Sequence, residues 1–170
     1  AKTTAETAQS TANSAKTTAE TAQSTANSAK TTAESMETLG KAWTQSNVTS
    51  GKFGVIVYAN SLWVAGSSTT GLYYSTDGKA WTQSNVTSGN FGVIVYANGL
   101  WVAGGIYNYN GLYYSTDGKA WTQSNVTSGN FGVVVYANGL WVAGSHNTNR
   151  PHYSTDGRIW TQSNVTNVYF

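Results

Sequence analysis

A unit of about 40 residues recurs along most of this chain, and this repetition limits the folds that the chain can adopt. The stretch GKAWTQSNVTSG occurs at Gly40, Gly78 and Gly118, and a related stretch, GRIWTQSNVT, occurs at Gly157. Between these copies lies FGVIVYANGLWVAG at Phe91, with two close copies elsewhere. Repeats of this length are typical of β-propeller blades and other repeated β units.

Each repeat is expected to form four short strands. In the second copy, residues 91–97 alternate and are rich in β-branched side chains, and Asn98-Gly99 is a strong signal for a type I′ hairpin. The following strands are expected at residues 100–103, 112–115 and 120–126. The sequence therefore predicts an all-β repeat head over residues 40–170.

A Ser-Thr-Asp-Gly turn separates the third and fourth strands, with Asp capping backbone N–H groups and Gly in a left-handed conformation. These turns and the Trp that follows resemble the Asp-box, the repeated hairpin motif of sialidase-like β-propellers. The usual pattern, Ser-x-Asp-x-Gly-x-x-Trp, is one residue longer between Asp and Trp. The residues that carry the resemblance are Ser75, Asp77, Gly78, Trp81, Ser115, Asp117, Gly118, Trp121, Ser154, Asp156, Gly157 and Trp160.

The resemblance covers residues 40–170 and implies a β-propeller fold. Similar repeats are familiar from tail-fibre-like proteins of phages and from surface proteins of Gram-positive gut bacteria. The resemblance therefore implies a head that is displayed outside the cell or on a virion surface.

Three blades do not close a ring around one axis, so the sequence predicts that other copies of the chain complete it. A homo-oligomer, either a dimer or a trimer, would supply six or nine blades. Residues 43–48 would then pair with the last third strand of a neighbour, which leaves the final strand, from Trp160, surplus. The alternative is a monomeric threefold β fold, such as a trefoil, although the Gln-x-Trp signature of that fold is absent.

Residues 1–39 differ in composition, because they contain no aromatic residue. The stretch AKTTAETAQSTANS fills residues 1–14 and recurs at 15–28, which places Ala alternately three and four positions apart. This spacing is that of a heptad seam and predicts an N-terminal α-helical coiled-coil stalk over residues 1–39. Thr and Ser are mediocre helix formers, so a flexible linker is the alternative. Because the sequence begins at Ala1 inside a repeat, we expect it to be a piece of a longer chain.

The carboxylates argue against an enzyme. The β repeats contain only Asp77, Asp117 and Asp156, all in predicted turns, whereas glycosidases need two carboxylates or a Tyr nucleophile backed by an acid. No catalytic residue is therefore predicted, and sialidase activity is not expected. The chain has no Cys and only two His residues, His146 and His152, so no metal site and no cofactor are predicted either.

The charge and hydropathy of the chain exclude two classes of partner. A net charge of +2 without a cluster of Lys and Arg argues against nucleic acid, and no apolar run is long enough to insert into a membrane. Charged residues make up 9% of the chain, well below the roughly 25% of typical soluble domains. Thr, Ser and Asn supply the polarity instead, as on many extracellular surfaces.

The repeats differ most between the second and third strands, at residues 67–70, 105–110 and 145–152. Aromatic rings stack on sugars, and Asn and Arg hydrogen-bond to hydroxyl groups. The predicted ligand-contact residues are Ser68, Thr69, Tyr107, Asn108, Tyr109, Asn110, His146, Asn147, Asn149, Arg150 and His152. The alternative is that these loops have drifted because nothing packs on them.

These patterns predict a binding function without chemistry. The expected protein is an adhesin or receptor-binding module that contacts a cell-surface glycan through its variable loops. The alternative is a purely structural or engineered repeat scaffold without a ligand. The Asn-Val-Thr of the fourth strand also matches the N-glycosylation pattern, but one strand copied four times supplies those matches without selection for them.

Overall fold

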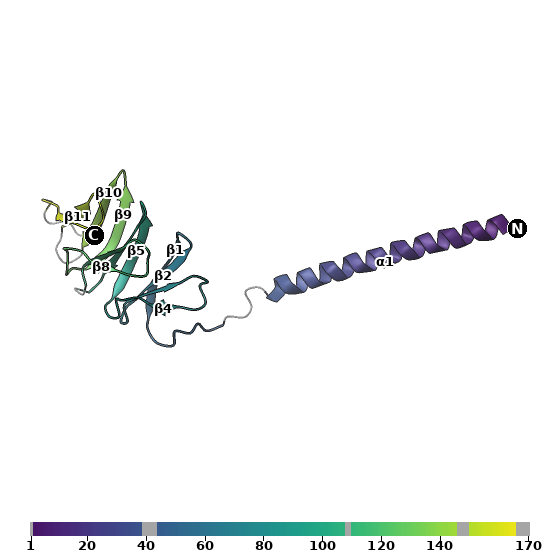
Figure 1. Cartoon of the computed structure of the whole chain (residues 1–170), viewed down its shortest axis with the longest axis horizontal. Coiled ribbons are helices and arrows are strands. Elements are labelled where there is room, and N and C mark those ends of the chain that lie inside the picture. The colour runs from purple at the N-terminus through teal and green to yellow at the C-terminus, as the bar shows by residue number, and fades with distance from the viewer. Residues whose placement is uncertain (1, 39–43, 108–109, 146–149, 166–170) are drawn as a thin grey trace. The chain divides into compact units, whose positions relative to one another are not determined.

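The structure is a computed structural model, which describes residues 2–38, 44–107, 110–145 and 150–165. The chain divides into two compact units, residues 1–44 and residues 45–170, and each is considered by itself. The described residues form one helix and three four-stranded antiparallel sheets (Figure 1). A mostly β repeat protein with an N-terminal helix is therefore confirmed, whereas ring closure and helix pairing stay predictions.

The helix α1 spans Lys2–Thr38, and its side chains make only weak local contacts. The Thr7 hydroxyl donates to the Thr3 carbonyl at 2.9 Å, and the same four-residue pattern recurs along the helix. Lys16 and Glu20 form an ion pair at 3.9 Å. Such pairs contribute only a few tenths of a kcal/mol each. The side chains of residues 3–34 are exposed, including the Ala seam.

Each sheet comes from one copy of the β unit, and its strands follow one another in chain order. We number these copies repeat 1, repeat 2 and repeat 3. Repeat 1 contains β1 (Phe53–Ala59), β2 (Leu62–Ser67), β3 (Leu72–Ser75) and β4 (Thr82–Gln83). Repeat 2 contains β5 (Phe91–Ala97), β6 (Leu100–Gly105), β7 (Leu112–Ser115) and β8 (Thr122–Gln123). Repeat 3 contains β9 (Phe131–Ala137), β10 (Leu140–Ser145), β11 (His152–Ser154) and β12 (Thr161–Gln162).

The predicted hairpin turn is confirmed, but the fourth strand is shorter than expected. Asn98 and Gly99 both have positive φ, at 50° and 73°, as a type I′ turn requires. The fourth strand of repeat 2 covers only Thr122–Gln123 rather than residues 120–126. The reason is local: the Ser124 hydroxyl accepts the N–H of Val126 at 3.0 Å, so the backbone turns there instead of continuing as a strand.

The hydrophobic core lies between the sheets. Strand β5 packs on β1 and β2, and β9 packs on β5 and β6, so the three sheets follow one another across the β part (Figure 1). We call the side of a sheet that the next repeat covers its leading face, and the side that covers the previous repeat its trailing face. The first core joins the leading face of repeat 1 (Leu62, Val64, Leu72) to the trailing face of repeat 2 (Phe91, Ile94, Trp101, Ala103). The second core repeats this arrangement between repeats 2 and 3.

Glycine allows the sheets to approach closely at one point in each interface. A Cβ atom on Gly66 would lie 2.9 Å from the carbonyl oxygen of Phe91 in the next repeat. The same crowding recurs between Gly104 and Phe131, at 2.8 Å. A larger residue at either position would push the sheets apart and open the core.

An amide pair fixes the position of each repeat on the next. The Asn85 Nδ2 donates to the Trp121 carbonyl at 2.9 Å, and the Trp121 N–H donates to Asn85 Oδ1 at 2.8 Å. Asn125 makes the same two hydrogen bonds with Trp160 in repeat 3. This pair uses both polar atoms of the amide, so the Asn of the apparent glycosylation pattern has a structural role.

We predict that Asn85→Asp lowers the free energy of unfolding by about 1–3 kcal/mol. A carboxylate still accepts the Trp121 N–H, but it cannot donate to the Trp121 carbonyl and repels its oxygen. Urea unfolding followed by Trp fluorescence measures the change. Thr87→Ala, at an exposed neighbouring position, is the control and should change stability by less than about 0.5 kcal/mol. Equal effects of the two substitutions would contradict the role given to the amide pair.

Candidate functional site

The Asp of each Ser-Thr-Asp-Gly turn is occupied by hydrogen bonds. Asp77 Oδ1 accepts the N–H of Ala80 at 2.9 Å, the N–H of Lys79 at 2.8 Å and the hydroxyl of Ser75 at 2.9 Å. The Ser75 hydroxyl oxygen in turn accepts the N–H of Gly78 at 2.9 Å. These bonds, led by that from Ala80, hold the pKa of Asp77 below its usual value.

The other two turns have the same geometry. Hydrogen bonds from the backbone of Ile159 and Arg158 lower the pKa of Asp156. At Asp117, burial alone would raise the pKa, but hydrogen bonds, first that from Ala120, outweigh it and the pKa is lowered. Carboxylates held ionised in this way are poor proton donors at neutral pH.

The variable loops begin and end on a common base. The Ser67 N–H donates to the Gly71 carbonyl at 2.9 Å in repeat 1, and the Gly105 N–H donates to the Gly111 carbonyl at 2.8 Å in repeat 2. The first pair encloses residues 68–70 and the second encloses residues 106–110. One base therefore carries loops of different length without a change in the strands.

A Gln from the fourth strand holds the last residue of each of these two loops. Gln83 Nε2 donates to the Thr70 carbonyl at 2.7 Å, and Gln123 Nε2 donates to the Asn110 carbonyl at 2.9 Å. Sequence analysis did not assign these residues to the loops, although the Gln is present in every TQSN copy. The Gln stays the same while the loop sequence changes, and this contrast was the signal that could have indicated its role.

The loop of repeat 1 is a closed polar turn. The Ser67 hydroxyl oxygen accepts the N–H groups of Thr69 and Thr70, at 3.2 and 3.1 Å, and the Thr70 hydroxyl, at 2.9 Å. Ser68 is half-buried and its N–H donates to the Lys52 carbonyl at 2.8 Å, whereas Thr69 is exposed. Most polar groups of this loop are therefore bonded within the protein.

The loop of repeat 2 is anchored at both ends. The Ile106 N–H donates to the Asn90 carbonyl at 2.8 Å, and the Ile106 side chain lies over Gly92, where an added Cβ would meet it at 2.8 Å. At the other end, Asn110 Nδ2 donates to the Ser88 carbonyl at 3.2 Å. These contacts hold the loop on the connection between repeats 1 and 2.

Tyr107 projects from this anchored loop. Its side chain is 67% exposed, and its backbone has a φ of 60°, which is uncommon for an aromatic residue. Asn110, with a φ of 83°, is half-buried. A positive φ costs free energy at a bulky residue such as Tyr, whereas Asn tolerates it more readily.

The predicted contact residues of the third loop are only partly described. Arg150 is half-buried. Five other predicted contact residues lie outside the described part of the chain: Asn108 and Tyr109 in the loop of repeat 2, and His146, Asn147 and Asn149 in the loop of repeat 3.

The position of His152 differs from the sequence prediction, which placed it in the variable loop. The structure places it in β11, buried at 7% exposure, with its ring against Phe131 at 5.3 Å between centroids. Tyr113 lies against Phe91 in the same way, at 5.5 Å, so His152 is the counterpart of that Tyr. The loop ends earlier because the Pro151 carbonyl already accepts the Ser163 N–H, at 2.8 Å.

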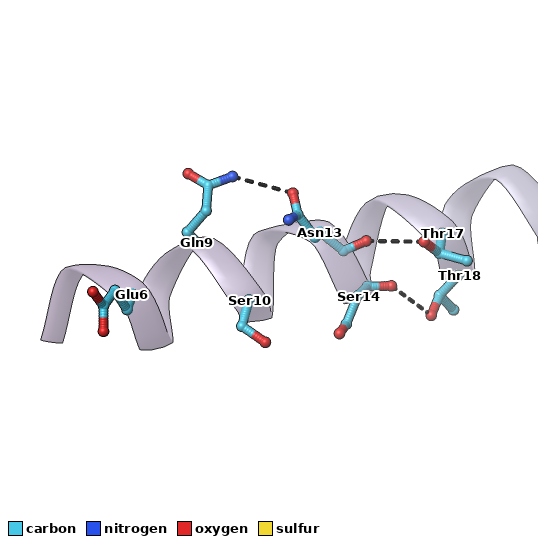
Figure 2. A pocket seen from close by; sticks show the side chains of 7 residues that line it. All are labelled: Glu6, Gln9, Ser10, Asn13, Ser14, Thr17 and Thr18. Atoms are coloured by element: carbon cyan, nitrogen blue, oxygen red, sulfur yellow. Dashed lines mark hydrogen bonds between the residues drawn. The ribbon is translucent and has the colours of Figure 1, made fainter. Parts of the chain in front are cut away.

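A hollow on α1 is a weaker candidate for a binding site than the anchored loop of repeat 2. Figure 2 shows its lining, which comes entirely from one exposed helix. Several of these side chains bond to the helix itself: Gln9 donates to Asn13, and the Thr17 hydroxyl donates to the Asn13 carbonyl (Figure 2). The described residues include no group of three or more His, Cys, Asp or Glu that could hold a metal ion. No described helix is long and apolar enough to cross a membrane.

Comparison with known proteins shows the fold alone. No protein-family model matches the chain, and no curated protein matches it. Among solved structures, the computationally designed Ika4 protein aligns with a TM-score of 0.57 and 7% identity, over 76% of this chain and 83% of that protein. The computationally designed Ika8 protein aligns with a TM-score of 0.53 and 6% identity, over 69% of this chain and 38% of that protein. The repeated sheet arrangement is therefore one that designed proteins also adopt.

We predict that the protein loses stability as the pH falls below about 6.5, and that His152→Tyr removes this loss. Burial lowers the pKa of His152, and a hydrogen bond with the Arg150 backbone opposes this only in part. The unfolded chain therefore binds a proton at a higher pH than the folded chain, so stability is full above pH 6.5 and declines below it.

The measurement is urea unfolding at several values between pH 7.5 and pH 5, where the turn carboxylates of the folded protein stay ionised. The variant carries the residue that repeats 1 and 2 have at this position, so it should pack without strain. A pH dependence that is the same in both proteins would show that His152 is not its source.

Proposed function

We propose that the β part is a non-catalytic binding module whose variable loops contact a cell-surface glycan, as in an adhesin or a receptor-binding head. The observation that carries the proposal is the loop of repeat 2. It is anchored by Ile106 and Asn110, and it presents an exposed Tyr107 in a costly backbone conformation. An aromatic ring held in this way offers a flat apolar surface for a sugar at little cost in conformational entropy.

The loops differ in sequence while the hydrogen bonds at their ends stay the same. This favours loops that present side chains to a ligand over loops that changed because nothing packs on them. The backbone pair and the Gln of the fourth strand recur in repeats 1 and 2 while the enclosed residues change. The occupied turn carboxylates support binding without catalysis. The Asp-box resemblance and a location outside the cell or on a virion are parts of this proposal.

The proposal extends to assembly. We propose that the three sheets are propeller blades, that two or three copies of the chain complete the ring, and that α1 pairs with its counterparts as a coiled-coil stalk. The exposed Ala seam of α1 supports helix pairing, because Ala allows close approach of helices. Repetition of loops around a ring would add avidity to weak single contacts.

A structural scaffold is the second candidate. It is favoured by the loop of repeat 1, whose polar groups are largely bonded around the Ser67 hydroxyl and so leave few for a ligand. Under this alternative, no loop substitution changes binding to any glycan.

We predict that Tyr107→Asn weakens glycan binding about two- to tenfold at a single site while the unfolding temperature stays the same or rises slightly. The ring is exposed, so its loss removes no core contact, and Asn tolerates a positive φ better than Tyr does. A glycan array identifies the ligand, and titration of that glycan with each protein measures the affinity.

A loop exchange gives the matched control. Replacing residues 105–110 by the Ser-Ser-Thr-Thr of repeat 1 keeps the base and supplies the Ser hydroxyl that closes the short turn. This variant should fold with an unchanged unfolding temperature and should not bind. If the folded wild-type head bound no glycan on the array, the scaffold would be the better description.

A further inference from the structure

The leading face of repeat 3 is apolar and uncovered. Leu62 and Leu100 are 6% and 5% exposed beneath the following repeat, whereas their counterpart in repeat 3, Leu140, is 36% exposed. Val142 is 39% exposed, whereas Val64, its counterpart in repeat 1, is fully buried. The side chains that form the internal cores therefore recur at this end of the β part with no repeat over them.

The trailing face of repeat 1 is uncovered in the complementary way. Ile56 is 54% exposed, whereas its counterpart Ile94 is 4% exposed against repeat 1. Phe53 is 38% exposed and its counterpart Phe91 is 1% exposed. The two ends of the β part thus present the two halves of one interface, which the chain itself forms twice.

A hollow in the trailing face of repeat 1 shows what shape is expected there. It is lined by Ser46, Val48, Phe53, Ile56, Ala65 and Trp81. In repeat 2 the counterparts of the last four are Phe91, Ile94, Ala103 and Trp121, which pack against Leu62, Val64 and Leu72. The hollow therefore matches the leading face of a repeat.

We propose that a second copy of this chain docks its repeat 1 on the repeat 3 of the first copy, so that each copy joins the next head to tail through this interface. The proposal rests on the self-association proposed above and specifies its surfaces. The second copy occupies the site because its trailing face is the surface that covers Leu62 and Leu100 within the chain.

Contacts between a basic side chain and a Tyr ring of the preceding repeat also support head-to-tail docking. The Lys119 Nζ lies over the Tyr74 ring of the preceding repeat at 5.8 Å, and the Arg158 guanidinium lies over Tyr114 at 5.7 Å. Tyr153 of repeat 3 is the next Tyr in this series and is 42% exposed. In the docked pair, Lys79 of the second copy lies over it.

The docking requires one strand to be exchanged. Asn47 Nδ2 donates to the Trp81 carbonyl at 2.9 Å, and the Trp81 N–H donates to Asn47 Oδ1 at 2.7 Å, as Asn85 does with Trp121 in the next repeat. Residues 44–48 thus lie where the fourth strand of a preceding repeat would run. The second copy brings this segment with it, so residues 161–165 of the first copy must leave β11.

Repeat 3 holds its own fourth strand less firmly than the other repeats do. The Leu72 N–H donates to the Val86 carbonyl at 3.0 Å, and the Leu112 N–H donates to the Val126 carbonyl at 2.9 Å. Pro151 takes this position in repeat 3 and has no N–H to donate. Repeat 3 therefore keeps only the pairing of β11 with β12 and the bond from the Ser163 N–H to the Pro151 carbonyl, at 2.8 Å.

Crosslinking between introduced Cys residues tests the interface. The chain has no Cys of its own, so only the introduced residues can react. One copy carries Tyr153→Cys and another carries Lys79→Cys, and the mixture is treated with a short bismaleimide. A covalent dimer of the two variants is expected. Tyr74→Cys with Lys119→Cys in one chain is the positive control, since those two side chains are in contact. A crosslink in the control but none in the mixture would overturn the proposal.

A matched pair of substitutions tests the strand exchange. Ser163→Pro removes one of the backbone bonds that hold residues 161–165 on β11, so it should lower the concentration at which the chain associates by about five- to tenfold. Ser46→Pro removes the N–H that the incoming segment needs for the same carbonyl, so it should raise that concentration by a similar factor. Analytical ultracentrifugation over a range of concentrations measures both. Shifts in the same direction, or no shift in either, would contradict the exchange.

The same samples separate this proposal from the others. Association through α1 alone would give oligomers in which the mixture of Tyr153→Cys and Lys79→Cys does not crosslink, and that result would overturn head-to-tail docking. Glycan binding by the loop of repeat 2 is measured in Ser46→Pro, which should bind through single sites. Loss of docking with retained glycan binding would therefore leave the proposed function standing.

Discussion

Every sheet of this protein is apolar on both faces, so a sheet gains most of its stability from the neighbours that cover it. In repeat 2, Ile94 on the trailing face and Val102 on the leading face are both buried, one by each neighbour. The cores consequently lie between repeats, and stability is approximately a sum over interfaces. At about 25 cal/mol for each Å² of apolar surface, the uncovered faces of the end repeats forgo a substantial part of that stabilisation.

Directional contacts determine how the sheets meet, because apolar burial alone does not fix their register. The amide pair of Asn85 with Trp121 locks the connection of one repeat onto the backbone of the next, and Gly66 allows the close approach at Phe91. The variable loops lie outside these contacts. Their base is held by backbone hydrogen bonds and by Gln83 or Gln123, so the residues that they enclose can change without disturbing a core.

The strands and turns could be predicted from the sequence because their signals are local. Alternation, Asn98-Gly99 and the capped Asp turn each act within a few residues. The use of Asn85 could not be found in this way, since its partner Trp121 is 36 residues away and belongs to another repeat. His152 was misplaced because its side chain differs from the Tyr of the other repeats, although it lies four residues before Asp156, as Tyr113 lies four residues before Asp117. Its partner Phe131 lies on another strand and could not be found from a local pattern. The faces that stay uncovered depend on which repeats are neighbours, which no local pattern records.

The chain carries four copies of TQSNV but only three copies of the other strands, and the structure gives each end copy a different task in the separate chain. The first copy places Asn47 and Val48 against the trailing face of repeat 1, which otherwise has no neighbour. The last copy, as β12, pairs with the backbone of β11, which would otherwise be an open edge. In the proposed head-to-tail pair, residues 44–48 of one copy would both cover repeat 1 of that copy and pair with β11 of the other copy. The surplus strand is therefore a property of the unassembled chain, where each end must be protected alone.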